Sequence, residues 1–280
     1  MKKKCLIAVA ILFCVMANAQ DNKTTKESSK VNFECLYEYQ VTNSKGNTDV
    51  YSTILLMADN YACFEYYTAY QTDSVSQVPN ISKEEVDKYL LQEMRNDLFF
   101  DQTVYQNYPK GRLSVYSVIT PDYYTYTENG RPVSWSLEED TETICGYLCR
   151  KATGVYGGRK WTAWYTTDIP VSFGPWKMCG LPGLVMAAHD AENIHNFKAI
   201  VFRKGTARLS SPDFPNAISV TREKFVKAKN RFEENPMGNI PAESISEMTV
   251  RKDDSGKSSV FINGIQLRMR PNGYIPLEIE

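Results

Sequence analysis

An alternation of apolar and polar residues with a period of two, repeated along most of the chain, constrains the fold more than any other feature. From Phe33 to Val41 the apolar side chains occupy every second position. This period is typical of an antiparallel strand with one face on a core. The pair Asn129-Gly130 predicts a tight hairpin between two such strands. Further strand-like segments lie at 50–57, 61–70, 113–120, 122–128, 133–137, 147–156, 159–167, 184–189, 197–204 and 260–267.

Two segments have helical periodicity instead. Ser82 and Glu85 form a capping-box pattern at the start of an amphipathic run at 83–97. Thr221 is a capping residue before a second run at 222–234. Together with the strand pattern, these runs predict an α+β fold. We expect a large antiparallel β-sheet, with a curved half-barrel as one form it can take, and two amphipathic helices.

The N-terminus has the three-part pattern of a secretory signal peptide. Lysines at positions 2–4 precede an uncharged apolar run at 6–16, and the small residues at 17–19 precede a cleavage point. The apolar run is shorter than the roughly 20 residues that cross a bilayer as a helix. We therefore predict a cleaved signal rather than a membrane anchor.

This pattern divides the chain and predicts its location. We expect a signal peptide at 1–19, a flexible polar leader at 20–30 and a single domain at 31–280. The mature chain is predicted to be exported, either periplasmic or secreted, and to contain no transmembrane segment. Export makes disulfides chemically permissible.

The five cysteines beyond the signal peptide are candidates for such disulfides. An odd number implies at least one free thiol or an intermolecular pair. Cys35 with Cys63 is one alternative, and Cys145 or Cys149 with Cys179 is another. Cys145 and Cys149 can bridge each other only if the chain turns between them, because four residues of straight strand span about 13 Å.

Charge and histidine content exclude several function classes. The formal net charge is −1, from 32 basic and 33 acidic residues, so no nucleic-acid partner is expected. The two histidines, His189 and His195, lie near Asp190 and Glu192 in the densest ionisable cluster. Because neighbouring residues on a strand point to opposite faces, we interpret this cluster as a solvated hairpin end. We predict no metal ion and no cofactor.

A segment rich in proline and glycine, 169–183, interrupts the strand pattern. It runs into Cys179-Gly180-Leu181-Pro182-Gly183-Leu184-Val185, and Gly146-Tyr147-Leu148-Cys149 and Trp161-Thr162-Ala163-Trp164 precede it. These residues resemble the GLPGLI family of exported bacterial proteins, with valine where the family name has isoleucine. The closing Tyr274-Ile275-Pro276-Leu277 resembles the family's tail. The resemblance implies export and one domain, and no reaction, since the family's function is uncharacterised. The layout also resembles half-barrel periplasmic carriers.

The same segment supplies the candidate contact residues for a ligand or partner: Phe173, Trp176, Leu181, Pro182 and Leu184. In one interpretation they form a clamp over an apolar groove, with Trp176 and Leu181 as contacts. In the other, the segment is a structural plug that closes one end of the sheet. Aromatic loops of this composition serve both purposes.

These observations favour a non-enzymatic protein that binds a lipid or other apolar ligand within the curved sheet. One alternative is a protein–protein interaction module of an envelope or secretion complex, with the 169–183 segment as its contact. A hydrolase that uses His189 and a nearby acid ranks last, because the sequence has no G-x-S-x-G motif. The apolar neighbours of Cys179 predict burial, which makes a thiol unreactive. We assign no catalytic residue.

Overall fold

A computed structural model describes residues 28–76, 82, 100–212, 214, 216–252, 256, 258–270 and 273–280. The strands of its main sheet are β2 (Phe33–Thr42), β3 (Thr48–Met57), β4 (Ala62–Tyr66), β5 (Gln102–Gln106), β6 (Arg112–Ile119), β7 (Asp122–Asn129), β8 (Ser136–Ile144), β9 (Tyr147–Tyr156), β10 (Arg159–Thr166), β11 (Leu184–Asp190), β12 (His195–Lys204) and β14 (Ile218–Ser219).

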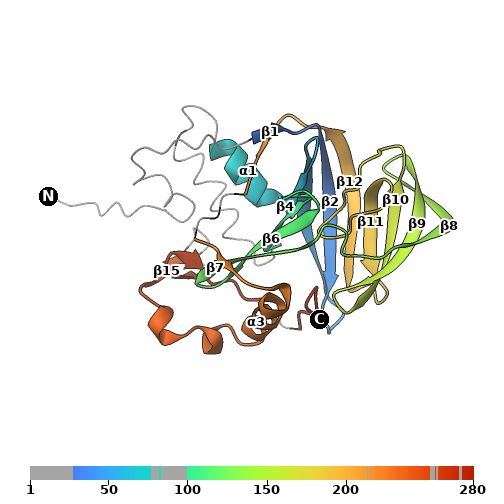
Figure 1. The fold of residues 1–280 in the computed structure, drawn as a ribbon. Coiled ribbons are helices and arrows are strands. Elements are labelled where there is room, and N and C mark those ends of the chain that lie inside the picture. The colour runs from blue at the N-terminus through green and yellow to red at the C-terminus, as the bar shows by residue number, and fades with distance from the viewer. Residues whose placement is uncertain are drawn as a thin grey trace.

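These twelve strands form one curved, open sheet (Figure 1). Their order is β14-β7-β6-β5-β4-β3-β2-β12-β11-β10-β9-β8, and β14 with β7 is the one parallel pair in it. The predicted large sheet is therefore confirmed, and most of its pairs are antiparallel as expected. The described chain is mostly β, so the α+β prediction holds chiefly in its β part.

The helices differ more from the sequence prediction. The second predicted helix is confirmed as α3 (Arg222–Glu234), whereas the predicted helix at 83–97 lies outside the described residues. The strand predicted at 61–70 is wrong in its second half, because β4 ends at Tyr66 and α1 (Tyr67–Ser76) begins there. Tyr67 and Tyr70 of α1 pack on a second apolar cluster, which a helical spacing of three residues permits.

The predicted hairpin at Asn129-Gly130 is also wrong. β7 ends at Asn129, and the chain crosses to β8 at the far edge of the sheet. The amide of Gly130 donates to the carbonyl of Gly111 at 3.0 Å. A Cβ on Gly130 would lie 2.7 Å from the carbonyl carbon of Gly111. This glycine therefore permits a close approach of two chain segments rather than a tight turn.

Both faces of the central strands are buried, which explains why their pattern is not strictly alternating. Leu55 of β3 belongs to the large core inside the curve, and its neighbour Leu56 belongs to a smaller cluster on the outer face, where α1 packs. The burial of both faces accounts for the run of apolar residues at the end of β3.

Several smaller elements lie outside the main sheet. They are β1 (Ser28–Lys30), β13 (Arg208–Ser210), the short 3-10 helices η1 (Met237–Asn239) and η2 (Ala242–Ser244), and the strands β15 (Met248–Lys252), β16 (Ser258–Ile262) and β17 (Ile265–Gln266). β1 pairs with β13, and β15, β16 and β17 form a separate antiparallel sheet. Figure 1 shows α3 beside β7 and the C-terminal tail next to α3.

Candidate ligand-binding groove

The predicted contact segment fills the inside of the sheet. Trp176, Leu181 and Leu184 are buried, with exposed fractions of 0%, 1% and 0%. Phe173 is half-buried and Pro182 is exposed. The Trp176 ring lies 5.7 Å from that of Trp161 and 6.5 Å from that of Phe197. Because Trp176 and Leu181 are enclosed within the large core, their positions favour the plug over the clamp.

Gln106 of β5 holds this plug in place. Its amide nitrogen donates to the carbonyls of Gly174 and Trp176 at 2.6 and 2.8 Å, and its oxygen accepts from the amide of Gly174 at 3.2 Å. Trp176 has a left-handed backbone with a φ of 51°. A bulky residue adopts this conformation only when its surroundings impose it. The hydrogen bonds of Gln106 are such a constraint.

Lys177, in the same segment, is fully buried in a polar network. Its Nζ donates to the hydroxyls of Tyr126 and Tyr156 at 2.7 and 2.8 Å and to Glu278 at 2.7 Å. It also lies 3.0 Å from Glu128. Burial, followed by the charges of Glu278 and Glu128, raises the pKa of both tyrosines, so both hydroxyls stay neutral. This network joins the plug to β7, β9 and the C-terminal tail.

The histidine cluster of the sequence is split by the fold. Asp190 pairs with Arg159 at 2.8 Å and accepts from the backbone amide of His195 at 3.0 Å. His189 is half-buried. Its Nδ1 lies 3.1 Å from the backbone carbonyl oxygen of Asp190 and does not contact the Asp190 carboxylate. The interpretation of a solvated hairpin end is wrong for Asp190 and His195, which are buried.

His195 is held as a neutral imidazole. Its Nδ1 lies 2.7 Å from the hydroxyl of Tyr39, and its Nε2 lies 3.2 Å from the carbonyl of Pro276. Nε2–H can therefore donate to the carbonyl while Nδ1 accepts from the phenol. Burial, and then the charge of Arg159, lowers the pKa of His195 from 6.5 to about 3.

We expect this histidine to make the protein sensitive to acid. Below pH 6.5 the unfolded chain binds a proton at His195 that the folded chain does not bind until about pH 3. The free energy of unfolding should therefore fall by about 2 kcal/mol between roughly pH 7 and pH 5. Urea unfolding at both pH values measures this loss. In His195→Gln, which keeps His189, most of it should disappear; equal losses in both proteins would contradict the assignment.

The structure describes Cys35, Cys63, Cys145, Cys149 and Cys179 and places no disulfide between any two of them. Cys35 and Cys63, one of the predicted pairs, lie on β2 and β4. β3 lies between these two strands, and the two thiols belong to clusters on opposite faces. This geometry excludes a bond between them. Burial raises the pKa of Cys149 to about 11 and those of Cys35 and Cys179 to about 12.

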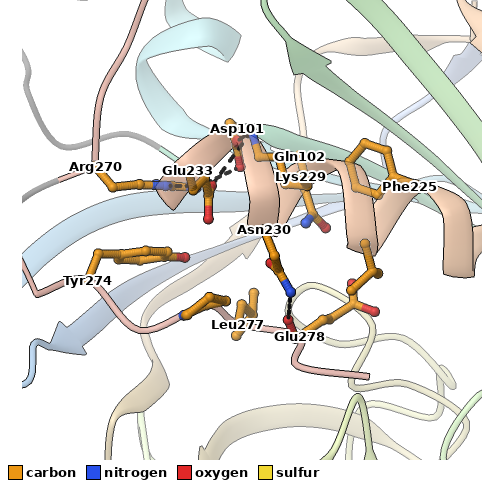
Figure 2. A pocket seen from close by; sticks show the side chains of 12 residues that line it. Asp101, Gln102, Phe225, Lys229, Asn230, Glu233, Arg270, Tyr274, Leu277 and Glu278 are labelled. Atoms are coloured by element: carbon orange, nitrogen blue, oxygen red, sulfur yellow. Dashed lines mark hydrogen bonds and ion pairs between the residues drawn. The ribbon is translucent and has the colours of Figure 1, made fainter. Parts of the chain in front are cut away.

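A second set of buried charges lies beneath α3 (Figure 2). Asp101 pairs with Lys229 and, at 3.0 Å, with Arg270, which also bonds Glu233 at 2.9 Å. Burial opposes the charge of Asp101, but Lys229 and Arg270 hold its pKa below the ordinary value. The cavity between these side chains and the tail has a volume of about 20 Å³, room for about one water molecule. The cluster therefore attaches α3 to the sheet and offers no space for a larger ligand.

The outer side of α3 borders a much larger cavity, which we name the α3 groove. Its volume is about 600 Å³. The turn between β6 and β7, the exposed face of α3, and the chain through η1 and η2 form its three walls. The lining residues are Ile119, Thr120, Pro121, Asp122, Tyr124, Lys224, Lys227, Ala228, Arg231, Phe232, Gly238, Asn239, Ile240, Pro241 and Ser244.

Local interactions position each wall of the α3 groove. The Oγ1 of Thr221 accepts from the amide of Lys224, so the predicted cap begins α3. Lys229 donates to the carbonyl of Val118 at 2.8 Å, which ties α3 to β6. At the other end, the side chain of Asn239 donates to the carbonyl of Arg231 at 3.0 Å and turns the chain back along the helix.

Sequence reasoning did not find the α3 groove. Only its α3 wall leaves a pattern in the sequence. Lys224, Lys227 and Arg231 are spaced by three and four residues and share one helix face with Ala228. Ala228 is exposed on this face. The two other walls come from residues distant in sequence.

Two further observations concern the described ranges only. They contain no group of three or more His, Cys, Asp or Glu side chains placed to hold a metal ion. No helix within them combines the length and apolar character needed to span a membrane.

Comparisons with known proteins give limited likenesses. No curated protein matches the chain. Two crystal forms of PNGF-II match with TM-scores of 0.47 and 0.45 at 15% and 13% identity, each over 82% of this chain. The chain spans 40% of the length of those structures. Residues 156–187, which include the whole plug segment at 169–183, match the model of Porph_ging, described as a protein of unknown function.

Proposed function

We propose that this chain is an exported, non-enzymatic binding protein that holds a lipid or other apolar small molecule in the α3 groove. The observation that carries the proposal is the groove itself. Its volume of about 600 Å³ lies within the roughly 300–1,000 Å³ of small-molecule sites. Because the plug fills the inside of the sheet, we place the ligand site on the outer side of α3 and not within the curved sheet.

The walls of the α3 groove support an apolar ligand. The end of β6 and the turn after it contribute Ile119 and Pro121, and the segment after α3 contributes Ile240 and Pro241. Phe232 lies at the base, with an exposed fraction of 4%. Removing apolar ligand surface from water against such residues gains about 25 cal/mol per Å².

We further propose that residues 31–280 form a single domain of the GLPGLI family. The family-model match over 156–187 supports this, because it includes Cys179-Gly180-Leu181-Pro182-Gly183-Leu184. The signal-peptide pattern of the sequence at 1–19 supports export to the periplasm or beyond. Cell fractionation with an antibody against the mature chain tests this location, and retention of the protein in the cytoplasm would contradict it.

A substitution that fills the α3 groove is expected to abolish ligand binding. Ala228 is exposed on the groove face of α3, so Ala228→Trp adds an indole to the cavity without disturbing the core. We expect the affinity for an uncharged apolar dye, N-phenyl-1-naphthylamine, to fall at least about tenfold. Fluorescence titration measures the change.

The matched control is Ala191→Trp, because Ala191 is exposed in the β11–β12 turn and does not line the groove. Its dye affinity should equal that of the unmodified protein. The natural ligand can be sought by purifying the protein from its native envelope, extracting it with organic solvent and analysing the extract by mass spectrometry. An empty extract together with no dye binding would refute the proposed function.

A further inference from the structure

The charges of α3 are distributed unevenly between its two faces. Arg222 and Lys229, which face the protein, pair with Glu278 and Asp101. Lys224, Lys227 and Arg231 are exposed and line the α3 groove. These three form no ion pair within the part of the chain that the structure describes. Among the described residues, the cations of α3 that form no ion pair are therefore the ones beside the groove.

The spacing of these three cations is suited to a single bound anion. Residues separated by three and four positions are neighbours on a helix surface, with Cβ atoms about 5–6 Å apart. Lys224, Lys227 and Arg231 thus make one row along the α3 wall. Three like charges in a row repel one another, and a bound anion relieves that repulsion.

The opposite walls of the α3 groove also differ in charge. Its cations all come from α3, whereas the β6–β7 turn and the segment after η1 supply Ile119, Pro121, Ile240 and Pro241. Asp122, on the β6–β7 wall, is the one acidic residue of the lining. An anionic group is repelled from that wall and attracted to α3. A ligand that matches both walls has an apolar body and a negative end.

We propose that the α3 groove binds a single-chain amphiphile with an anionic head, a carboxylate or a phosphate, whose head contacts Lys224, Lys227 and Arg231. The apolar chain lies against the β6–β7 turn and the η1–η2 segment. This inference rests on the proposed function and adds the chemistry of the ligand to it. Lysine and arginine both bind such oxyanions through charge-assisted hydrogen bonds.

Three amphiphiles with the same chain and different heads test the proposal. Dodecanoate, dodecyl maltoside and dodecyltrimethylammonium are titrated calorimetrically into the mature protein below their micelle concentrations. Dodecanoate should bind at least about tenfold more tightly than the trimethylammonium compound, with the maltoside between them. Added salt should weaken the dodecanoate affinity most, because partly exposed charges are screened.

A charge-reversal variant assigns the effect to α3. Lys227→Glu/Arg231→Glu should lower the dodecanoate affinity at least about tenfold and leave the maltoside affinity within about twofold. The control, Lys160→Glu/Lys198→Glu, reverses two exposed lysines outside the groove and should bind dodecanoate as the unmodified protein does.

The outcomes separate this inference from the proposed function. If all three heads bind equally, or if the charge reversal leaves the dodecanoate affinity unchanged, the head assignment is wrong and the apolar site stands. Displacement of dodecanoate by inorganic phosphate alone would show a general anion site, and this result would contradict the proposal of an amphiphilic ligand. If none of the three compounds binds but the uncharged dye does, the amphiphile is wrong and the apolar site stands. If neither they nor the dye bind and the extract is empty, the proposed function itself fails.

Discussion

Replacing Lys177 by methionine is expected to lower the free energy of unfolding by about 3–5 kcal/mol. Methionine is unbranched and keeps most of the length of the side chain, but it removes the cation that bonds Glu278 at 2.7 Å and lies 3.0 Å from Glu128. Arg222 then remains as the partner of both carboxylates, at 2.7 and 3.8 Å. An excess negative charge stays in a buried site, and its desolvation is no longer offset. Urea unfolding near neutral pH measures the loss.

The control restores the charge balance. In the natural network, Lys177 and Arg222 face Glu128 and Glu278, two cations against two anions. Lys177→Met/Glu278→Gln leaves one of each. If uncompensated charge causes the loss, the double variant should be more stable than Lys177→Met alone, although it lacks more native contacts. A double variant less stable than the single one would show that the lysine acts mainly through packing.

Sequence periodicity predicted the parts of the fold that depend on local pattern. The strand 147–156 and the helix 222–234 have the predicted bounds, because turn residues or caps delimit each of them. The prediction at 61–70 failed, because its tyrosines fit a strand or a helix equally well. Packing of Tyr67 and Tyr70 on the outer cluster, between residues distant in sequence, selects the helix.

The candidate sites were less predictable, because they depend on which distant residues meet. An apolar segment with a single lysine gives no indication that Lys177 lies between Tyr126, Tyr156 and Glu278. The same limit applies to the α3 groove, whose walls are joined by Lys229 and the carbonyl of Val118. A row of cations on one helix face is visible in the sequence, but a solvated face has the same pattern.

The structure explains, in contrast, why the family-like segment Gly180-Leu181-Pro182-Gly183 has this sequence. Gly180 has a φ of 92°, in the region where glycine is favoured. Leu181 follows it into the core, with an exposed fraction of 1%, and Pro182 faces solvent. Gly183 then passes against the end of β10. Gly180, Leu181 and Gly183 therefore each have a role in inserting the plug.

Gly183→Ala should consequently be among the most damaging single substitutions in the chain. A Cβ at this position would lie 2.0 Å from the carbonyl oxygen of Thr166 and 2.6 Å from its carbonyl carbon. Both atoms are backbone, so no side-chain rotation relieves the overlap, and β10 or the plug must move. We expect a loss of about 4 kcal/mol or more, measured by urea unfolding or, where no folded protein is recovered, by its absence from the soluble fraction. The adjacent Pro182→Ala, at an exposed position, should cost about 1 kcal/mol or less. Equal stability of Gly183→Ala and Pro182→Ala would mean that the plug does not depend on this close approach.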